Sequence, residues 1–247
     1  MSTKIMINNV QKYIEEEFFS KEKFKLKPFI NADNNQEIYH NEANLQYELA
    51  LSLKEEFKDK IEIKLEYPVQ KLFNDEKIKL SKKEIDIIIK IKNKKDAFLI
   101  IELKFPKSDA GMPLALLHTL NDIQFCEQIE GVNKEYGMDL YFMTIFLTNK
   151  DNWTSKKHIY HVFQIANKIR NENSEFKLNR KTELKNPIQI ISDKIEKDEK
   201  RMKENKKYLN HWISDSNNKI IFKNEHIINW RKTVDKWLYF VHKIKRK

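Results

Sequence analysis

Charged residues inside two aliphatic, strand-like runs are the feature that most constrains how this chain folds. The runs surround a polar turn and occupy residues 83–105, KEIDIIIKIKNKKDAFLIIELKF. Side chains alternate between the two faces of a strand, so Asp86 shares a face with Ile88, and Glu102 with Lys104. The opposite faces are predicted to be wholly apolar: Ile85, Ile87, Ile89, Ile91, Leu99, Ile101, Leu103 and Phe105. Burying charge in a sheet costs free energy, so these acids require a functional explanation.

The two acids are predicted to face each other. A hairpin that folds symmetrically about Lys94 places Asp86 directly opposite Glu102, with Cβ atoms about 5 Å apart. Two carboxylates at that separation repel each other unless they share a proton or a metal ion. Mg²⁺ prefers carboxylates, backbone oxygens and water as ligands. With Mg²⁺ bound between the two acids, Lys104 would lie beside a metal-bound water. The pattern predicts a Mg²⁺ site in which Mn²⁺ substitutes.

These residues resemble the PD-(D/E)XK, or restriction-endonuclease-like, nuclease superfamily, whose signature is an Asp on one core strand and an acid-x-Lys on the next. Asp86, Glu102 and Lys104 match the signature, with Ile85 in place of the motif's Pro. The resemblance covers about residues 40–155. It implies an α/β (α+β) fold with a core of order α-β-β-β-α-β, in which helices flank a mixed central sheet.

The resemblance also implies roles for individual residues. Asp86 and Glu102 are expected to bind the metal with the backbone carbonyl of Leu103, and Lys104 to position or activate water. In the family a further acid is often supplied by the first helix. The predicted activity is that of a Mg²⁺-dependent DNA endonuclease of restriction, repair or phage-defence type, with RNA as an alternative substrate.

Residues 41–58 are predicted to form that first helix, because apolar side chains recur every four residues. The stripe consists of Leu45, Leu49, Leu53 and Phe57. Glu42 projects into the stripe, Gln46 lies near its edge and Glu48 falls outside it. Glu42 is either the helix acid of the metal site or a first-turn residue favoured by the helix dipole. Glu48 is the reserve candidate for the same role, and Gln46 a candidate substrate contact.

The remaining pattern predicts a single domain, 1–247, made of the core, an N-terminal helical extension at 1–35 and a C-terminal helical addition at 156–247. The expected elements are a helix at 3–19, strands at 61–70, 138–147 and 237–244, a helix at 114–130, and a long amphipathic helix after Pro187. That last helix either packs on the body or pairs with a second copy, which leaves a homodimer or larger assembly open. On the 114–130 helix, Gln124 and Gln128 are candidate substrate contacts and Cys126 is a small core residue.

Composition adds weaker constraints. The formal charge of +10 suits a polyanionic partner, but the basic residues are mostly Lys, which serve phosphate binding better than base recognition. His158 and His161 are assigned to an exposed helical face rather than to a metal. The one cysteine excludes an internal disulfide, and no apolar run is long enough to span a bilayer, so a cytoplasmic protein is expected. A non-catalytic protein that binds nucleic acid with the same fold is the competing prediction.

Overall fold

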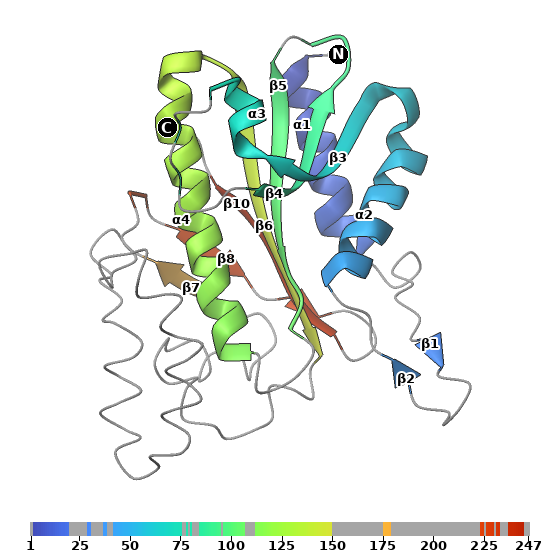
Figure 1. Ribbon diagram of the computed structural model, residues 1–247. Helices are drawn as coiled ribbons and strands as arrows, with labels where there is room; N and C mark the ends of the chain where they lie inside the picture. Colours follow the sequence, from blue (N-terminus) through green and yellow to red (C-terminus); the bar gives the residue numbers. More distant parts are fainter. Residues whose placement is uncertain are drawn as a thin grey trace, which may run out of the picture.

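The structure is a computed structural model, and its described residues are 2–19, 29–30, 37–38, 42–75, 78, 80, 84–94, 96–106, 112–149, 175–178, 223–224, 226–229, 231–232 and 237–244. A six-stranded mixed sheet runs through the molecule in the order β3-β4-β5-β6-β10-β9 (Figure 1). Its strands are β3 (Ile61–Pro68), β4 (Glu84–Ile91), β5 (Ala97–Lys104), β6 (Asp139–Asn149), β9 (Arg231–Lys232) and β10 (Trp237–Ile244). Two short strand pairs form separate ladders: β1 (Phe29–Ile30) with β2 (Glu37–Ile38), and β7 (Glu175–Leu178) with β8 (His226–Asn229).

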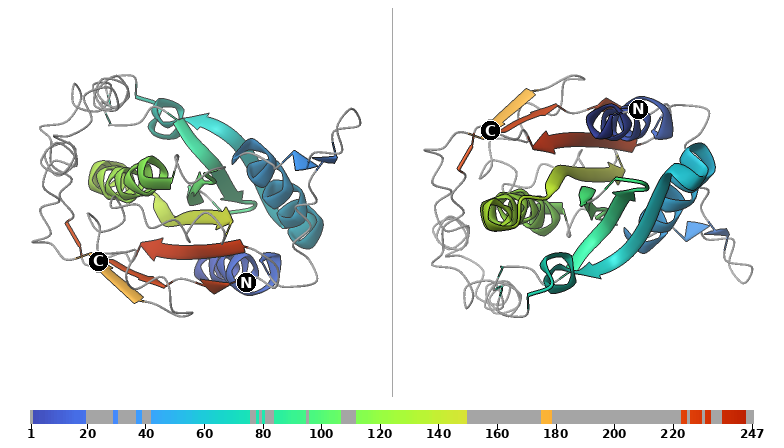
Figure 2. Two further views of the ribbon diagram at one scale, coloured as in Figure 1. Left: turned by 90° about the horizontal axis from the view of Figure 1, so that it is seen from below. Right: turned by 90° about the horizontal axis from the view of Figure 1, so that it is seen from above.

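Helices cover both faces of the sheet, as predicted for an α+β fold (Figure 2). One face is covered by α1 (Thr3–Lys12), its π-helical continuation (Tyr13–Phe18) and α2 (Glu42–Phe57), which ends in a 3-10 turn (Lys58–Lys60). The other face is covered by α3 (Val69–Phe73) and α4 (Met112–Tyr136). The helices expected at 3–19 and 41–58 are confirmed, whereas α3 was not predicted. Among the described helices, none is long and apolar enough to cross a membrane.

The central hairpin has the predicted register. Ile87 pairs with Ile101, and the pairing continues to Lys90 opposite Phe98. The tip is polar, and Asn93 (φ 63°) and Asp96 (φ 53°) adopt left-handed backbone conformations, which these two residue types tolerate better than most. Continued by one residue, this register brings Asp86 opposite Glu102.

The prediction that one face of the hairpin is wholly apolar is correct except at one residue. The apolar residues predicted for that face pack with α1 and α2, apart from Ile85, which joins Ile88 in the cluster under α4. The neighbouring strand supplies a reason, because Glu66 has a φ of 46° and alternation on β3 fails there. Beyond Glu66, Tyr67 packs against the α4 cluster, whereas Leu65 is exposed.

Strand direction explains the long helix α4. Strands β5 and β6 are parallel, which requires a crossover between them, and α4 supplies it. The helix continues to Tyr136, past the predicted end at residue 130 and through Gly131.

The predicted strand at 237–244 is confirmed as β10, and all of β10 pairs antiparallel with β6. The predicted helix after Pro187, His158 and His161 all lie outside the described residues.

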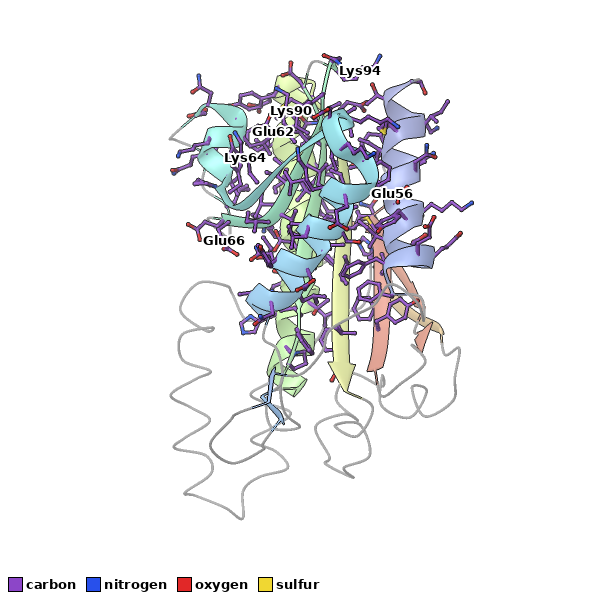
Figure 3. The ribbon with its side chains drawn as sticks, turned by 90° about the vertical axis from the view of Figure 1, so that its right-hand side faces the viewer. Glu56, Glu62, Lys64, Glu66, Lys90 and Lys94 are labelled. Carbon is purple, nitrogen blue, oxygen red and sulfur yellow. The ribbon has the colours of Figure 1, made fainter. Side chains whose placement is uncertain are left out.

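Edge strand β3 carries charge on its solvent side. Glu62, Lys64 and Glu66 project from it, and Glu62 lies opposite Lys90 of β4 (Figure 3). Charged side chains on an edge strand oppose pairing with another chain, so this edge is protected. The acids of the hairpin lie instead at the far end of β4 and β5 from the tip at Lys94.

Candidate active site

Three elements bring charged side chains together where β5 ends. The ammonium of Lys104 lies 3.4 Å from Glu42 Oε1 of α2 and 3.8 Å from Asp86 Oδ2 of β4. Only 14% of the Lys104 side chain is exposed, so these charges interact in a partly desolvated setting. Sequence reasoning predicted this convergence, although the three residues are far apart along the chain.

Asp86 is held by hydrogen bonds on both its side chain and its backbone. The backbone N–H of Leu103 donates to Asp86 Oδ2 at 2.7 Å. The side-chain amide of Gln46 donates to the backbone oxygen of Asp86 and, at 2.7 Å, to Glu66 Oε1. Gln46 is buried, so it braces α2 against β3 and β4. Its amide nitrogen is engaged by these two acceptors, and its role as a substrate contact stays a prediction.

Glu42 lies in the first turn of α2 and also contacts the site. Its Oε2 accepts a hydrogen bond from the backbone N–H of Phe105 at 3.2 Å, directly after Lys104. Burial raises the pKa of Glu42 above its ordinary value of 4.5; the Lys104 ammonium opposes this, and the Asp86 carboxylate adds to it. The reserve candidate Glu48 is half-buried, and six residues of helix leave its side chain about 120° from Glu42 around the helix axis.

Glu102 begins a buried polar row across the sheet. Its side chain is 1% exposed, and it pairs in register with Thr144 of β6. Thr144 in turn pairs with His242 of β10. Residues opposite each other on neighbouring strands face the same side, so all three lie on the face that α4 covers. Glu102 is therefore far more enclosed than the hairpin pattern alone implied.

Asp122 of α4 belongs to this site and was missed by sequence reasoning. Its Oδ2 lies 3.1 Å from Lys104 Nζ, closer than either predicted carboxylate, and the residue is 5% exposed. The signal in the sequence was an acid between Leu120 and Ile123, two core residues of the helix.

The predicted contacts Gln124 and Gln128 are half-buried, and helical spacing points Gln124 away from Asp122. Cys126 is fully buried, as predicted.

A second buried polar cluster joins α4 to the C-terminal strands. Glu127 Oε1 lies 3.0 Å from His226 Nε2, and His226 Nδ1 lies 3.0 Å from His242 Nε2. The same carboxylate accepts backbone hydrogen bonds from Lys223 at 2.7 Å and Asn224 at 2.8 Å. Sequence reasoning missed this cluster as well, because its members are about a hundred residues apart.

The atoms around Lys104 that could bind a metal ion are carboxylate and carbonyl oxygens. Lys104 Nζ also donates to the backbone oxygen of Leu103, the predicted third metal ligand. Within the described residues, no three His, Cys, Asp or Glu side chains are arranged to hold a metal ion as they stand. Comparisons of the chain with protein-family models, curated proteins and solved structures find no match.

Proposed function

We propose that this protein is a metal-dependent nuclease that hydrolyses phosphodiester bonds, with DNA as the first candidate substrate and RNA as the second. One observation carries the proposal: Glu42, Asp86 and Lys104 converge from three separate elements, at the end of a hairpin whose register brings Asp86 opposite Glu102. The element order α2-β3-β4-β5-α4-β6, interrupted only by the short α3, supports the restriction-endonuclease-like core that the motif implies.

The chemistry of the site suits a hard divalent cation. Its donors are oxygens, the type that Mg²⁺ and Mn²⁺ prefer. The Asp86 carboxylate contributes to the raised pKa of Glu42, and a cation between them would oppose that effect. The ammonium of Lys104 already forms ion pairs with these carboxylates, so the site stabilises a positive charge.

Each residue then has a separate task. Asp86, Glu102 and the Leu103 carbonyl would hold the cation, and Glu42 would complete the negative charge around it. When bound, the cation supplies Lewis-acid polarisation of the phosphate and a lowered pKa of water. Lys104 positions the attacking water and stabilises negative charge that develops in the transition state. Gln46 keeps the backbone of Asp86 in place.

A second candidate function is a non-catalytic protein that binds nucleic acid or another partner. The observation that favours it is the position of Lys104, whose ammonium bonds to the same oxygens that a metal would need. In that case Lys104 would contact phosphate and take no part in hydrolysis.

The decisive experiment incubates the protein with duplex DNA, single-stranded DNA, branched DNA and RNA in Mg²⁺ or Mn²⁺. Wild type is expected to cleave at least one of them, and Lys104→Ala to lower cleavage by roughly 10²-fold or more without weakening metal binding. Lys90→Ala is the matched control, because Lys90 is an exposed lysine on the same hairpin (Figure 3).

The same proteins separate the two candidate functions. Binding to nucleic acid is measured in Ca²⁺ at several salt concentrations. A lysine that only contacts phosphate weakens binding when it is removed and lowers the salt slope by about one. If wild type cleaves none of the four substrates and Lys104→Ala loses affinity in this way, the binding protein replaces the nuclease.

A further inference from the structure

Lys104 lies between carboxylates supplied from opposite faces of the sheet. Glu42 belongs to α2, which packs on one face, and Asp122 belongs to α4, which packs on the other (Figure 2). The Lys104 ammonium is 3.1 Å from Asp122 Oδ2, against 3.4 Å for Glu42 and 3.8 Å for Asp86. Among these three ion pairs, the shortest is with the acid that the nuclease motif does not contain.

A divalent cation cannot share its oxygens with this ammonium. Lys104 now bonds to Glu42 and to the Leu103 carbonyl, two of the groups that would face the cation. Like charges at such separations repel strongly in a partly buried site. The ammonium must withdraw from these oxygens, yet it cannot enter solvent freely, because its side chain is 14% exposed and is flanked by protein.

We propose that Asp122 is the positioning residue for Lys104, holding its ammonium beside the site while a divalent cation takes the oxygens of Asp86, Glu102 and Leu103, with Glu42 next to it. Asp122 suits this task because its side chain is 7% exposed and is fixed on a long helix rather than on a loop. A lysine ammonium on its flexible stem can move toward Asp122 without a change in the backbone. This inference rests on the proposed function, since it assigns a residue to the same metal site.

A double-mutant cycle on metal affinity tests the role without relying on activity. Mn²⁺ binding is measured by calorimetry for wild type, Asp122→Asn, Lys104→Met and the double variant. In the presence of Lys104, Asp122→Asn should weaken binding by roughly ten-fold, because the ammonium then stays on Glu42 and competes with Mn²⁺. In the Lys104→Met background the same change should have no effect.

Conservative variants separate positioning from a structural role. Asp122→Glu keeps the charge and should restore Mn²⁺ affinity to within about threefold of wild type. Glu135→Gln removes an exposed carboxylate from the same helix and should leave affinity unchanged, which controls for net charge. Should Asp122→Asn not fold, Asp122→Ser takes its place in the cycle, and thermal melts check every variant.

Each contrary outcome overturns a specific claim. Equal loss of Mn²⁺ affinity in both backgrounds would make Asp122 a metal ligand, and unchanged affinity in both would leave it a structural residue; either result overturns the positioning role. Absence of Mn²⁺ binding by wild type overturns both this inference and the metal-dependent function. If wild type binds Mn²⁺ and the cycle behaves as expected but no nucleic acid is cleaved, the proposed function alone fails.

Discussion

The carboxylate of Asp86 accepts a hydrogen bond from the backbone N–H of Leu103 at 2.7 Å, just beyond the last ladder pair of the central hairpin, Ile87 with Ile101. A side chain thus continues the pairing of β4 and β5 after the backbone ladder has ended. The bond fixes the ends of the two strands relative to each other. It therefore places Asp86 against the strand that carries Glu102 and Lys104.

Replacing Asp86 by Ala should remove metal binding and also lower stability. Loss of the carboxylate leaves the buried N–H of Leu103 without that acceptor, at a cost of about 1–3 kcal/mol in the free energy of unfolding. Calorimetry with Mn²⁺ and urea denaturation measure the two effects. Glu84→Ala, an exposed acid on the same strand, should change neither. Equal Mn²⁺ binding by wild type and Asp86→Ala would show that Asp86 is not a ligand.

Glu42→Gln and Glu48→Gln should behave differently. Glu42→Gln is expected to lower cleavage, whereas Glu48→Gln should be nearly silent.

The stability of the protein should depend on pH through Glu42. Burial raises the pKa of Glu42 above 4.5, the Lys104 ammonium opposes this rise, and the Asp86 carboxylate adds to it. Folding therefore disfavours the ionised form of Glu42. The metal-free wild type should therefore lose stability relative to Glu42→Gln as the pH rises above about 4.5. Denaturation at a series of pH values checks the sign; the reverse trend would contradict it.

Glu127 should stabilise the fold at neutral pH. Burial alone would raise its pKa, but hydrogen bonds from His226 and from the backbone of Lys223 and Asn224, with the charge of His226, lower it below 4.5. A lowered pKa contributes stability that is present above the unfolded value of 4.5 and is lost as the pH falls through the folded value. Glu127→Gln should cost about 1–3 kcal/mol near pH 7.

The pH dependence is the check on the Glu127 prediction. The difference in stability between wild type and Glu127→Gln should shrink below pH 4.5 and be smallest in strong acid. Glu135→Gln on the exposed side of the same helix should show no such change. A constant difference across the whole pH range would mean that the charge of Glu127 is not what stabilises the cluster with His226 and His242.

Gln46→Leu should affect catalysis through Asp86 rather than through substrate binding. The change removes the hydrogen bonds to the backbone of Asp86 and to Glu66, so the carboxylate of Asp86 is less well positioned. We expect a lower kcat with little change in KM, together with a loss of about 1–3 kcal/mol in stability. Asn8→Leu, which changes an exposed amide on α1, is the control. A rise in KM with an unchanged kcat would instead assign Gln46 to substrate binding.

Much of the candidate site could be predicted because it follows from local rules. Alternation on two adjacent strands fixes which side chains share a face, and a short turn fixes the register of a hairpin. These two rules were enough to place Asp86 beside the strand of Glu102 and Lys104. The apolar stripe of α2 was likewise readable and put Glu42 on the correct side of its helix.

Two local details escaped the same rules. Alternation on β3 fails at Glu66, whose positive φ is not encoded by a glycine, and Ile85 on the paired strand also departs from its predicted face. The end of α4 was misplaced at residue 130, although the helix continues through Gly131 to Tyr136 while packed on the sheet. In both cases tertiary packing outweighed the local preference.

By itself, the sequence determined the hairpin and the stripe of α2, and it offered Glu42 as a partner of Asp86 and Lys104 with a first-turn role as the alternative. Only the tertiary structure decided that α4 brings Asp122 to Lys104 and Glu127 to His226. The rotation of a helix against a sheet depends on how all its side chains pack, and the pairing of β10 with β6 joins segments almost a hundred residues apart. Neither the helix rotation nor this strand pairing is fixed by a periodicity along the chain. The sequence therefore shows Asp122 and Glu127 only as acids among apolar residues of a helix, and it does not name their partners.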